Sequence, residues 1–258
     1  MFIRSKLFEQ HHIQGLFSTR HGGISPPPFE HLNLGLNLGD SSDHIQENLR
    51  RLCQASNIPL PHRSIQTHGI ETMICQGEGI QHQHDADILI TSTANTSVAV
   101  RTADCLPILL IDTHKHIAAA VHAGWRGTAK NIVQIAIQKM QILGAKPEHI
   151  LASLGPCIGS CCFEVDVKAA QQLADSHPQA HQHLHQQKQK SYPDLQAINQ
   201  CQLLSSGIKK QHIEMVRQCT YCQILNFFSW RRDQKKAAGC WPWFNLQHPS
   251  HSLYPNIY

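Results

Sequence analysis

The side chains best suited to chemistry in this 258-residue chain are His68, Cys105 and His122, each at the end of a predicted strand. Two histidines and one cysteine that leave a fourth position open are a ligand set for catalytic zinc, and copper accepts the same imidazole and thiolate donors. Alternatively, Cys105 is a thiolate nucleophile activated by His122, with Asp104 or His68 as the orienting group. The residue pattern alone leaves these alternatives open.

A predicted hairpin positions Cys105 and His122. Two apolar runs, Leu106–Asp112 and Ile117–His122, are joined by a polar tetrapeptide, which is the pattern of two buried strands and a short loop. A hairpin centred on that loop pairs Pro107 with His122. Cys105 then lies within about two residues of His122 across the ladder, where side chains can meet.

Two arginines stand beside glycines in segments that could bind an anion. Arg20 is followed by Gly22, where backbone N–H groups can approach an anion, although a turn with a surface arginine is the simpler interpretation. Arg126 lies just before a predicted helix, whose first N–H groups have no partner within the helix.

The acidic and thiol side chains have simpler interpretations. Asp85 and Asp87 precede an apolar strand and are interpreted as turn caps. Ten cysteines in a chain without an evident export signal indicate reduced thiols rather than disulfides. Cys219 and Cys222 have zinc-knuckle spacing, and a second pair could be drawn from three more cysteines: Cys157, Cys161 and Cys162. That second pair is not a clean C-x2-C knuckle, so free thiols fit better.

Composition limits the protein class. A chain of 258 residues with 41% hydrophobic residues fits one large domain or two small ones. It has no apolar run of about 18 residues, and its first residues lack the apolar core of a signal peptide. The net charge of +4 comes from scattered basic residues. We therefore expect a cytoplasmic protein that binds neither membranes nor nucleic acid.

Helices are predicted to punctuate a larger number of strands, which indicates an α/β or α+β domain. Apolar residues at helical spacing predict a helix capped by Asp43 and another that runs from residue 132 to Gly144. The histidine-rich residues 177–190 are expected to form a solvated loop or helix end.

Seven motifs occur in order along the chain: Thr19-Arg20-His21-Gly22-Gly23, Gln66-Thr67-His68-Gly69, Asp85-Ala86-Asp87, Arg101-Thr102-Ala103-Asp104-Cys105-Leu106-Pro107, His122-Ala123-Gly124-Trp125-Arg126-Gly127, Gly155-Pro156-Cys157-Ile158 and Phe228-Ser229-Trp230-Arg231-Arg232-Asp233. Together they resemble the YfiH family, also called the laccase-domain or multicopper polyphenol oxidase family and, more recently, purine nucleoside phosphorylase. The resemblance covers residues 1–236, which we expect to form one domain.

The resemblance implies an α+β fold, layered α/β/β/α with mixed β-sheets. It implies a zinc ion bound by His68, Cys105 and His122, with copper as the other candidate metal. The implied activities are phosphorolysis of adenosine, inosine, guanosine and S-methyl-5′-thioadenosine, and deamination of adenosine. Purine nucleosides and phosphate are then the partners of a monomer or small homo-oligomer.

These reactions assign roles to further residues. Deamination needs a proton shuttle, for which Asp104 and Glu164 are candidates, and phosphorolysis needs an oxyanion pocket, for which Arg20 with Gly22, and Arg126, are candidates. Copper-dependent polyphenol oxidation fits less well, because a multicopper oxidase needs several copper centres. A metal-free Cys/His hydrolase acting on peptidoglycan precursors is the third hypothesis.

The C-terminal residues 237–258 depart from the family pattern. The family continues from Arg232-Asp233 through a Gly-Arg pair into a closing apolar strand, whereas here Gly239 is followed by Cys240 and then by a tail rich in proline and histidine. Because proline cannot donate to a β-ladder, these prolines argue against a central strand.

Overall fold

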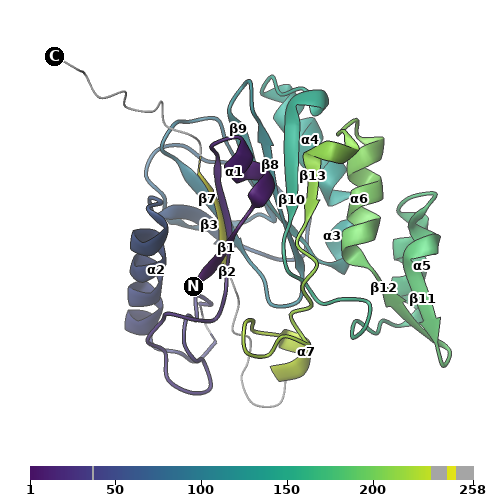
Figure 1. Ribbon diagram of the computed structural model, residues 1–258, viewed down its shortest axis with the longest axis horizontal. Coiled ribbons are helices and arrows are strands. Elements are labelled where there is room, and N and C mark those ends of the chain that lie inside the picture. The colour runs from purple at the N-terminus through teal and green to yellow at the C-terminus, as the bar shows by residue number, and fades with distance from the viewer. Residues whose placement is uncertain (37, 234–242, 248–258) are drawn as a thin grey trace.

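The chain folds into four layers, two β-sheets packed face to face between two layers of helices (Figure 1). The structure, a computed structural model, describes residues 1–36, 38–233 and 243–247. The first sheet consists of β1 (Phe2–Arg4), β2 (Gln14–Ser18), β14 (Trp243–Gln247), β7 (Ser97–Arg101), β3 (Pro61–Ile65) and β5 (Gln81–Asp85), in that order. The second sheet consists of β13 (Ile213–Met215), β10 (Ile150–Leu154), β8 (Leu106–Asp112), β9 (Ile117–Ala123), β6 (Ile88–Thr91) and β4 (Thr72–Ile74), in that order.

Both sheets mix parallel and antiparallel pairs, so the predicted α+β fold with α/β/β/α layers is confirmed. A two-stranded hairpin, β11 (Leu184–Gln187) with β12 (Lys190–Pro193), stands apart from both sheets. It includes part of the histidine-rich segment that was expected to be a loop or helix end, so that expectation is only partly correct.

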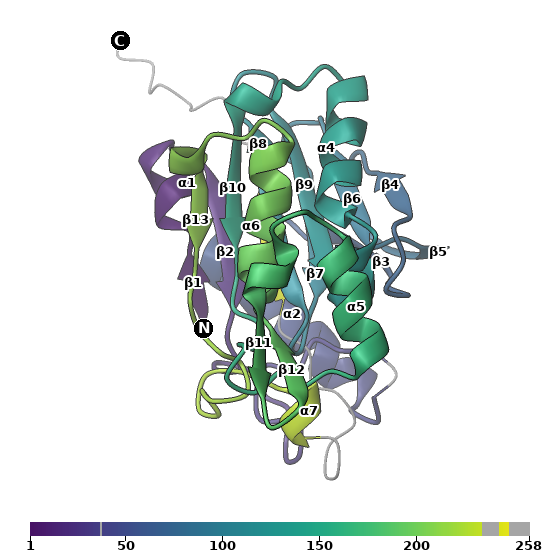
Figure 2. The ribbon, with the colours of Figure 1, turned by 90° about the vertical axis from the view of Figure 1, so that its right-hand side faces the viewer.

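The outer helices cover the second sheet on one side and the first sheet on the other. Figure 2 views the molecule from the side of α4, α5 and α6, which lie in front of the second sheet. The helices are α1 (Lys6–Gln10), α2 (Ser42–Ser56), α3 (Trp125–Ala129), α4 (Ile132–Ile142), α5 (Val167–Asp175), α6 (Leu195–Ser205) and α7 (Trp230–Asp233), with short 3-10 turns at Pro147–His149, Ala180–His183 and Lys210–His212.

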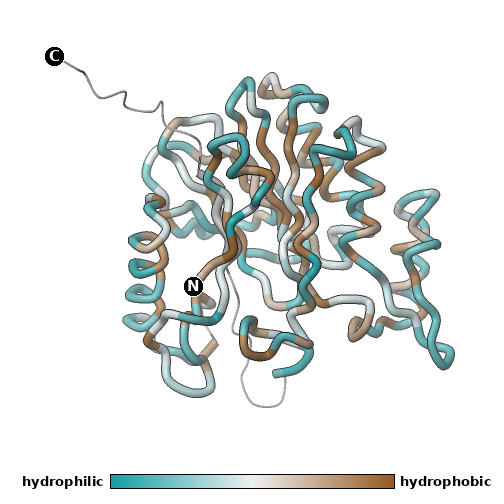
Figure 3. The backbone as a smooth tube through the Cα atoms, in the orientation of Figure 1, coloured by the Kyte–Doolittle hydropathy of each residue, from teal (hydrophilic) through white to brown (hydrophobic). Residues whose placement is uncertain are grey.

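Strand β8 shows why the central strands are apolar at nearly every position. Ile108 and Leu110 point toward the helices α4 and α6, whereas Leu109 and Ile111 point into the core between the sheets. A strand buried on both faces has no polar side, so its sequence loses the alternation of an exposed strand. The tube in Figure 3 accordingly shows hydrophobic residues concentrated in the central strands.

The helix layers follow from the same patterning. Helix α4 buries a stripe at helical spacing that includes Ile132, Ala136 and Met140, and Gly144 follows it with φ +103°, a conformation that favours glycine. Helix α2 begins earlier than predicted. Its cap is Ser41, whose hydroxyl accepts the backbone N–H of Asp43, so the prediction that Asp43 is the cap is wrong.

The predicted hairpin has the predicted register. Strand β8 pairs with β9 so that Asp112 lies opposite Ile117 and Pro107 opposite His122. The two apolar runs and the polar connection between them were enough to determine which residues face one another.

The prediction that no central strand follows Arg232-Asp233 is wrong. Strand β14 lies between β2 and β7 and is antiparallel to both. Pro242 and Pro249 flank these five residues in the sequence, so every paired residue keeps its backbone N–H. Residues 237–242 and 248–258 of the tail lie outside the described residues.

No helix in the described ranges is both long and apolar enough to cross a lipid bilayer.

Candidate metal centre and adjoining cavity

His68, Cys105 and His122 converge at one end of the central hairpin. Their ligand atoms all lie within 4.8 Å of one another. Sγ of Cys105 is 3.6 Å from Nε2 of His68, and the two imidazole rings meet edge to face with centroids 4.8 Å apart. The structure therefore brings the three predicted ligands together.

Local backbone geometry positions each of these side chains. Cys105 directly precedes β8, and His122 lies in β9 opposite Pro107. His68 lies in the loop between β3 and β4 with φ +60°, an uncommon conformation for a residue with a side chain. Gly124 passes so close that a Cβ atom there would be 3.0 Å from the Cys105 sulfur, so the absence of a side chain keeps the space open.

The buried carboxylate of Asp87 holds this arrangement. It accepts the backbone N–H groups of Thr67, His68 and Gly69 at 3.2, 3.2 and 2.8 Å, which fixes the loop that carries His68. Its Oδ1 also lies 2.6 Å from Nδ1 of His122, and both side chains are buried. A proton on Nδ1 leaves the lone pair of Nε2 facing the site.

Nε2 of His122 is the observation that fits a metal. It is buried and lacks a hydrogen bond of good geometry among the described residues, although the Cys105 thiol interacts with its ring. A buried nitrogen that faces a thiol and a second imidazole would be satisfied by a metal ion bound to all three. A carboxylate–histidine pair behind a ligand nitrogen is the usual support of a protein-bound zinc ion, so the residues present fit such an ion.

The pKa values favour a thiolate next to an imidazolium when no cation is bound. Burial alone would raise the pKa of Cys105, but the imidazoles of His122 and His68 outweigh it and lower that pKa to about 6. Burial would likewise lower the pKa of His122, but the Cys105 thiolate and the Asp87 carboxylate raise it to about 9. A thiolate is the form of cysteine that binds metals and attacks electrophiles.

A cavity of about 530 Å³ opens from these three residues. Its wall carries the aromatic rings of Trp125, Phe163 and Trp230, together with the guanidinium groups of Arg126 and Arg231. One side of this wall comes from the segment after β10 and from the start of α7. Such a cavity is large enough for a small organic ligand.

The two predicted proton-shuttle residues both line the cavity but differ in their surroundings. Asp104 is buried, with φ +87°, and its carboxylate accepts Thr220 Oγ1 at 2.6 Å, Ser229 Oγ at 3.0 Å and the backbone N–H of Arg231 at 2.7 Å. Burial raises the pKa of Asp104 in spite of these donors.

Glu164 is half-exposed and lies 2.8 Å from the ammonium group of Lys190. The hydrogen bond from Lys190 lowers the pKa of Glu164.

The three predicted phosphate-binding residues are separated. Arg126 lines the cavity with its guanidinium 4.5 Å above the ring of Trp125. Arg20 and Gly22 are not among the lining residues. The Arg20 side chain instead donates to the carbonyl oxygens of Glu30 and Ile224 at 2.8 and 3.0 Å. The structure thus places Arg126 at the cavity and leaves Arg20 and Gly22 outside it.

Sequence reasoning missed the role of Asp87. Its signal was the Asp-Ala-Asp motif before an apolar strand, which was interpreted as turn capping. Asp87 does cap a turn, through its three backbone N–H bonds, but the same carboxylate reaches His122 on another strand.

This chain matches the family model described as multi-copper polyphenol oxidoreductase laccase over residues 14–241. It is 37% identical over 228 residues to purine nucleoside phosphorylase YfiH of Shigella flexneri, covering 87% of this chain and 91% of the relative. It is 34% identical over 235 residues to purine nucleoside phosphorylase YlmD of Geobacillus stearothermophilus, covering 86% and 85%. The crystal structure of the Bacillus licheniformis hypothetical protein YfiH matches with a TM-score of 0.87 at 27% identity, covering 95% of this chain and 96% of the other.

Proposed function

Because this chain belongs to the YfiH family, we propose that it is a zinc-dependent purine nucleoside phosphorylase that also deaminates adenosine. The observation that carries the proposal is the buried Nε2 of His122, aligned by Asp87 beside Cys105 and His68 at the end of a ligand-sized cavity. Both relatives are purine nucleoside phosphorylases by name, and a cavity of about 530 Å³ is large enough for a nucleoside.

His68, Cys105 and His122 would hold the zinc ion, which when bound supplies Lewis acidity to an oxygen of the substrate or of water. Asp87 keeps the proton of His122 on Nδ1, away from the cavity. The aromatic side chains of the cavity wall offer faces on which a purine base can stack.

Arg126 is the proposed phosphate-binding residue of the cavity. Among the described residues its guanidinium makes a cation–π contact with Trp125 and no hydrogen bond, so its donors can bind phosphate oxygens. Arg20 and Gly22, outside the cavity wall, are weaker candidates for this role. Asp104 and Glu164 are the proposed groups for proton transfer, and Glu164 has the greater access to solvent.

The test is phosphorolysis of inosine, followed by chromatography of released hypoxanthine with and without phosphate. Cys105→Ala and His122→Ala should each lose one zinc ion per chain and the activity, whereas Cys53→Ala, in α2 and not part of the cavity wall, should keep both. Unchanged phosphate-dependent hypoxanthine release in the two ligand variants would refute the proposal.

A second candidate follows from the lowered pKa of Cys105 beside the Asp87–His122 pair. Thiolate, imidazole and carboxylate in this order are also the parts of a cysteine hydrolase, for example one acting on peptidoglycan precursors. Turnover by zinc-free protein that iodoacetamide abolishes by modifying Cys105 would favour the hydrolase. Oxygen consumption with a phenol by a stoichiometrically copper-loaded protein would instead favour the polyphenol oxidase.

A further inference from the structure

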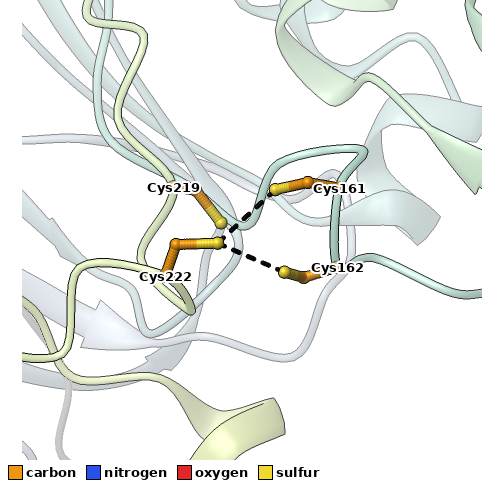
Figure 4. Close-up of side chains that lie close together, drawn as sticks. All are labelled: Cys161, Cys162, Cys219 and Cys222. Carbon is orange, nitrogen blue, oxygen red and sulfur yellow. Dashed lines mark hydrogen bonds between the residues drawn. The ribbon is translucent and has the colours of Figure 1, made fainter.

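Four cysteine thiols gather outside the cavity, at the junction of two loops (Figure 4). The cysteine cluster consists of Cys161, Cys162, Cys219 and Cys222, whose sulfur atoms all lie within 4.8 Å of one another. The sulfur of Cys222 is 3.6 Å from that of Cys161 and 3.4 Å from that of Cys162. All four are free thiols, so the cluster is held together without a disulfide.

The fold brings these residues together from distant parts of the sequence. Cys161 and Cys162 lie between β10 and α5, and Cys219 and Cys222 lie between β13 and α7. The two loops are joined by a parallel bridge between Cys157 and Cys219. The sequence had suggested Cys157 as a partner of the C-x2-C pair, but Cys157 is buried and outside the cluster.

Gly159 brings the backbone of the loop between β10 and α5 next to the sulfur atoms of the cluster. Its backbone N–H donates to Sγ of Cys219 at 3.2 Å. A Cβ atom at this position would lie 3.2 Å from Sγ of Cys161 and 3.6 Å from Sγ of Cys219, so the glycine lets the backbone approach the cluster closely. Backbone N–H groups that donate to sulfur stabilise thiolates, which is what a metal site needs.

We propose that Cys161, Cys162, Cys219 and Cys222 bind a zinc ion, separate from the centre at His68, Cys105 and His122. Four thiolates in a tetrahedral arrangement are a zinc ligand set, and Zn–S bonds of about 2.3 Å place the sulfurs about 3.8 Å apart. The cluster is already near this spacing, with contacts of 3.4 and 3.6 Å. A site with four protein ligands is closed, so its role is structural.

The contacts favour a metal over a disulfide. The sulfur of Cys222 approaches both Cys161 and Cys162, and a disulfide can use only one of these contacts. A single ion uses all four thiols at once. A cluster with several metal ions would hold its thiolate ligands farther apart, so the cysteine cluster fits one ion.

A zinc ion here would tie together the loops that build one wall of the cavity. The loop of Cys161 and Cys162 continues into Phe163 and Glu164, and the loop of Cys222 leads to Arg231. The guanidinium of Arg231 donates two hydrogen bonds of 3.0 Å to the carbonyl oxygen of Glu164. Loss of the ion should therefore loosen this wall without removing a ligand of the other centre.

The first experiment measures zinc content in the full chain by elemental analysis. Cys222→Ser should lose about one zinc ion per chain relative to the wild type, His122→Ala should lose a different one, and the double variant should lose both. Cys53→Ser is the matched control and should lose none. The readout is the difference in zinc content between each variant and the wild type. Total zinc content is not used, because His62, Cys75 and His82 form a third group of potential ligands that is the same in every variant.

The second experiment identifies the donors in wild-type protein, so it does not depend on the folding of a variant. After loading with ¹¹³Cd, NMR should show one resonance typical of four sulfur ligands besides that of the mixed site. The proposal is overturned by unchanged zinc content in Cys222→Ser or by the absence of a four-sulfur resonance. A disulfide within the cluster of freshly purified protein, found by thiol titration and mass spectrometry, also overturns it.

Discussion

Replacing Asp87 by Asn tests whether its carboxylate holds the ligands of the metal centre in position. The two carboxylate oxygens accept N–H groups from three successive residues and from His122. An amide has only one acceptor oxygen, so its NH₂ group must face donors whichever way it is oriented. With the amide nitrogen toward Thr67 and Gly69, two partly buried N–H groups lose their acceptor. At about 0.5–1.5 kcal/mol each, the free energy of unfolding should fall by about 1–3 kcal/mol.

The same substitution should weaken metal binding. Loss of a carboxylate behind a ligand histidine typically costs about 10–100-fold in metal affinity. We therefore expect Asp87→Asn to hold zinc about 10–100-fold more weakly, measured by competition with a chromophoric chelator, and to unfold at a lower urea concentration. Asp85→Asn is the matched control, because Asp85 is exposed and two residues away. Wild-type affinity for zinc in folded Asp87→Asn would refute the assignment of Asp87 as the support of His122.

Three further predictions test other parts of the structure. Gly124→Ala should weaken zinc binding, measured by the same competition, because the new Cβ would press on the Cys105 sulfur at 3.0 Å. Arg126→Ala should raise the KM for phosphate while zinc content stays constant, whereas Arg20→Ala should leave that KM unchanged. The reverse result would assign phosphate binding to Arg20 instead of Arg126. Asp112 accepts three backbone N–H groups, and these lower its pKa although burial opposes the shift. Because the folded pKa lies below the unfolded value of about 3.9, the stabilisation is present above that value and lost as pH falls through the folded pKa. Asp112→Asn should therefore lower the free energy of unfolding by about 1–3 kcal/mol at neutral pH and by less near pH 3, measured by urea denaturation. An equal loss at both pH values would contradict this reasoning.

Local patterning predicted the part of the site that lies within one hairpin. The apolar runs and the polar connection were sufficient for the register that brings Cys105 to His122, because both strands are adjacent in sequence. Arg20 shows the limit of such reasoning. Its glycine-rich turn resembles an anion site, yet its guanidinium is used to hold the backbone of Glu30 and Ile224. Which loops line a cavity depends on long-range packing, and local composition does not report it.

Local sequence patterns argue against the C-terminal strand and favour free thiols over the cysteine cluster. The prolines near β14 argue against a central strand, but only prolines inside the paired residues remove ladder donors. The C-x2-C pair was noticed, but its partners are the adjacent residues Cys161 and Cys162, which do not have knuckle spacing. The fold supplies the missing geometry by laying the two loops side by side through the Cys157–Cys219 bridge.

Asp104 connects the two candidate metal sites. It adjoins Cys105 in sequence, and its carboxylate binds Thr220, which adjoins Cys219. Its other oxygen accepts from Ser229 and from the backbone of Arg231 in the cavity wall. Both oxygens of Asp104 are engaged by these loops, so this carboxylate positions them in addition to the proton transfer proposed for it. Loosening the cysteine cluster should therefore affect catalysis through the hydrogen bonds to Asp104 and the packing of Arg231, rather than through the ligands of the first metal.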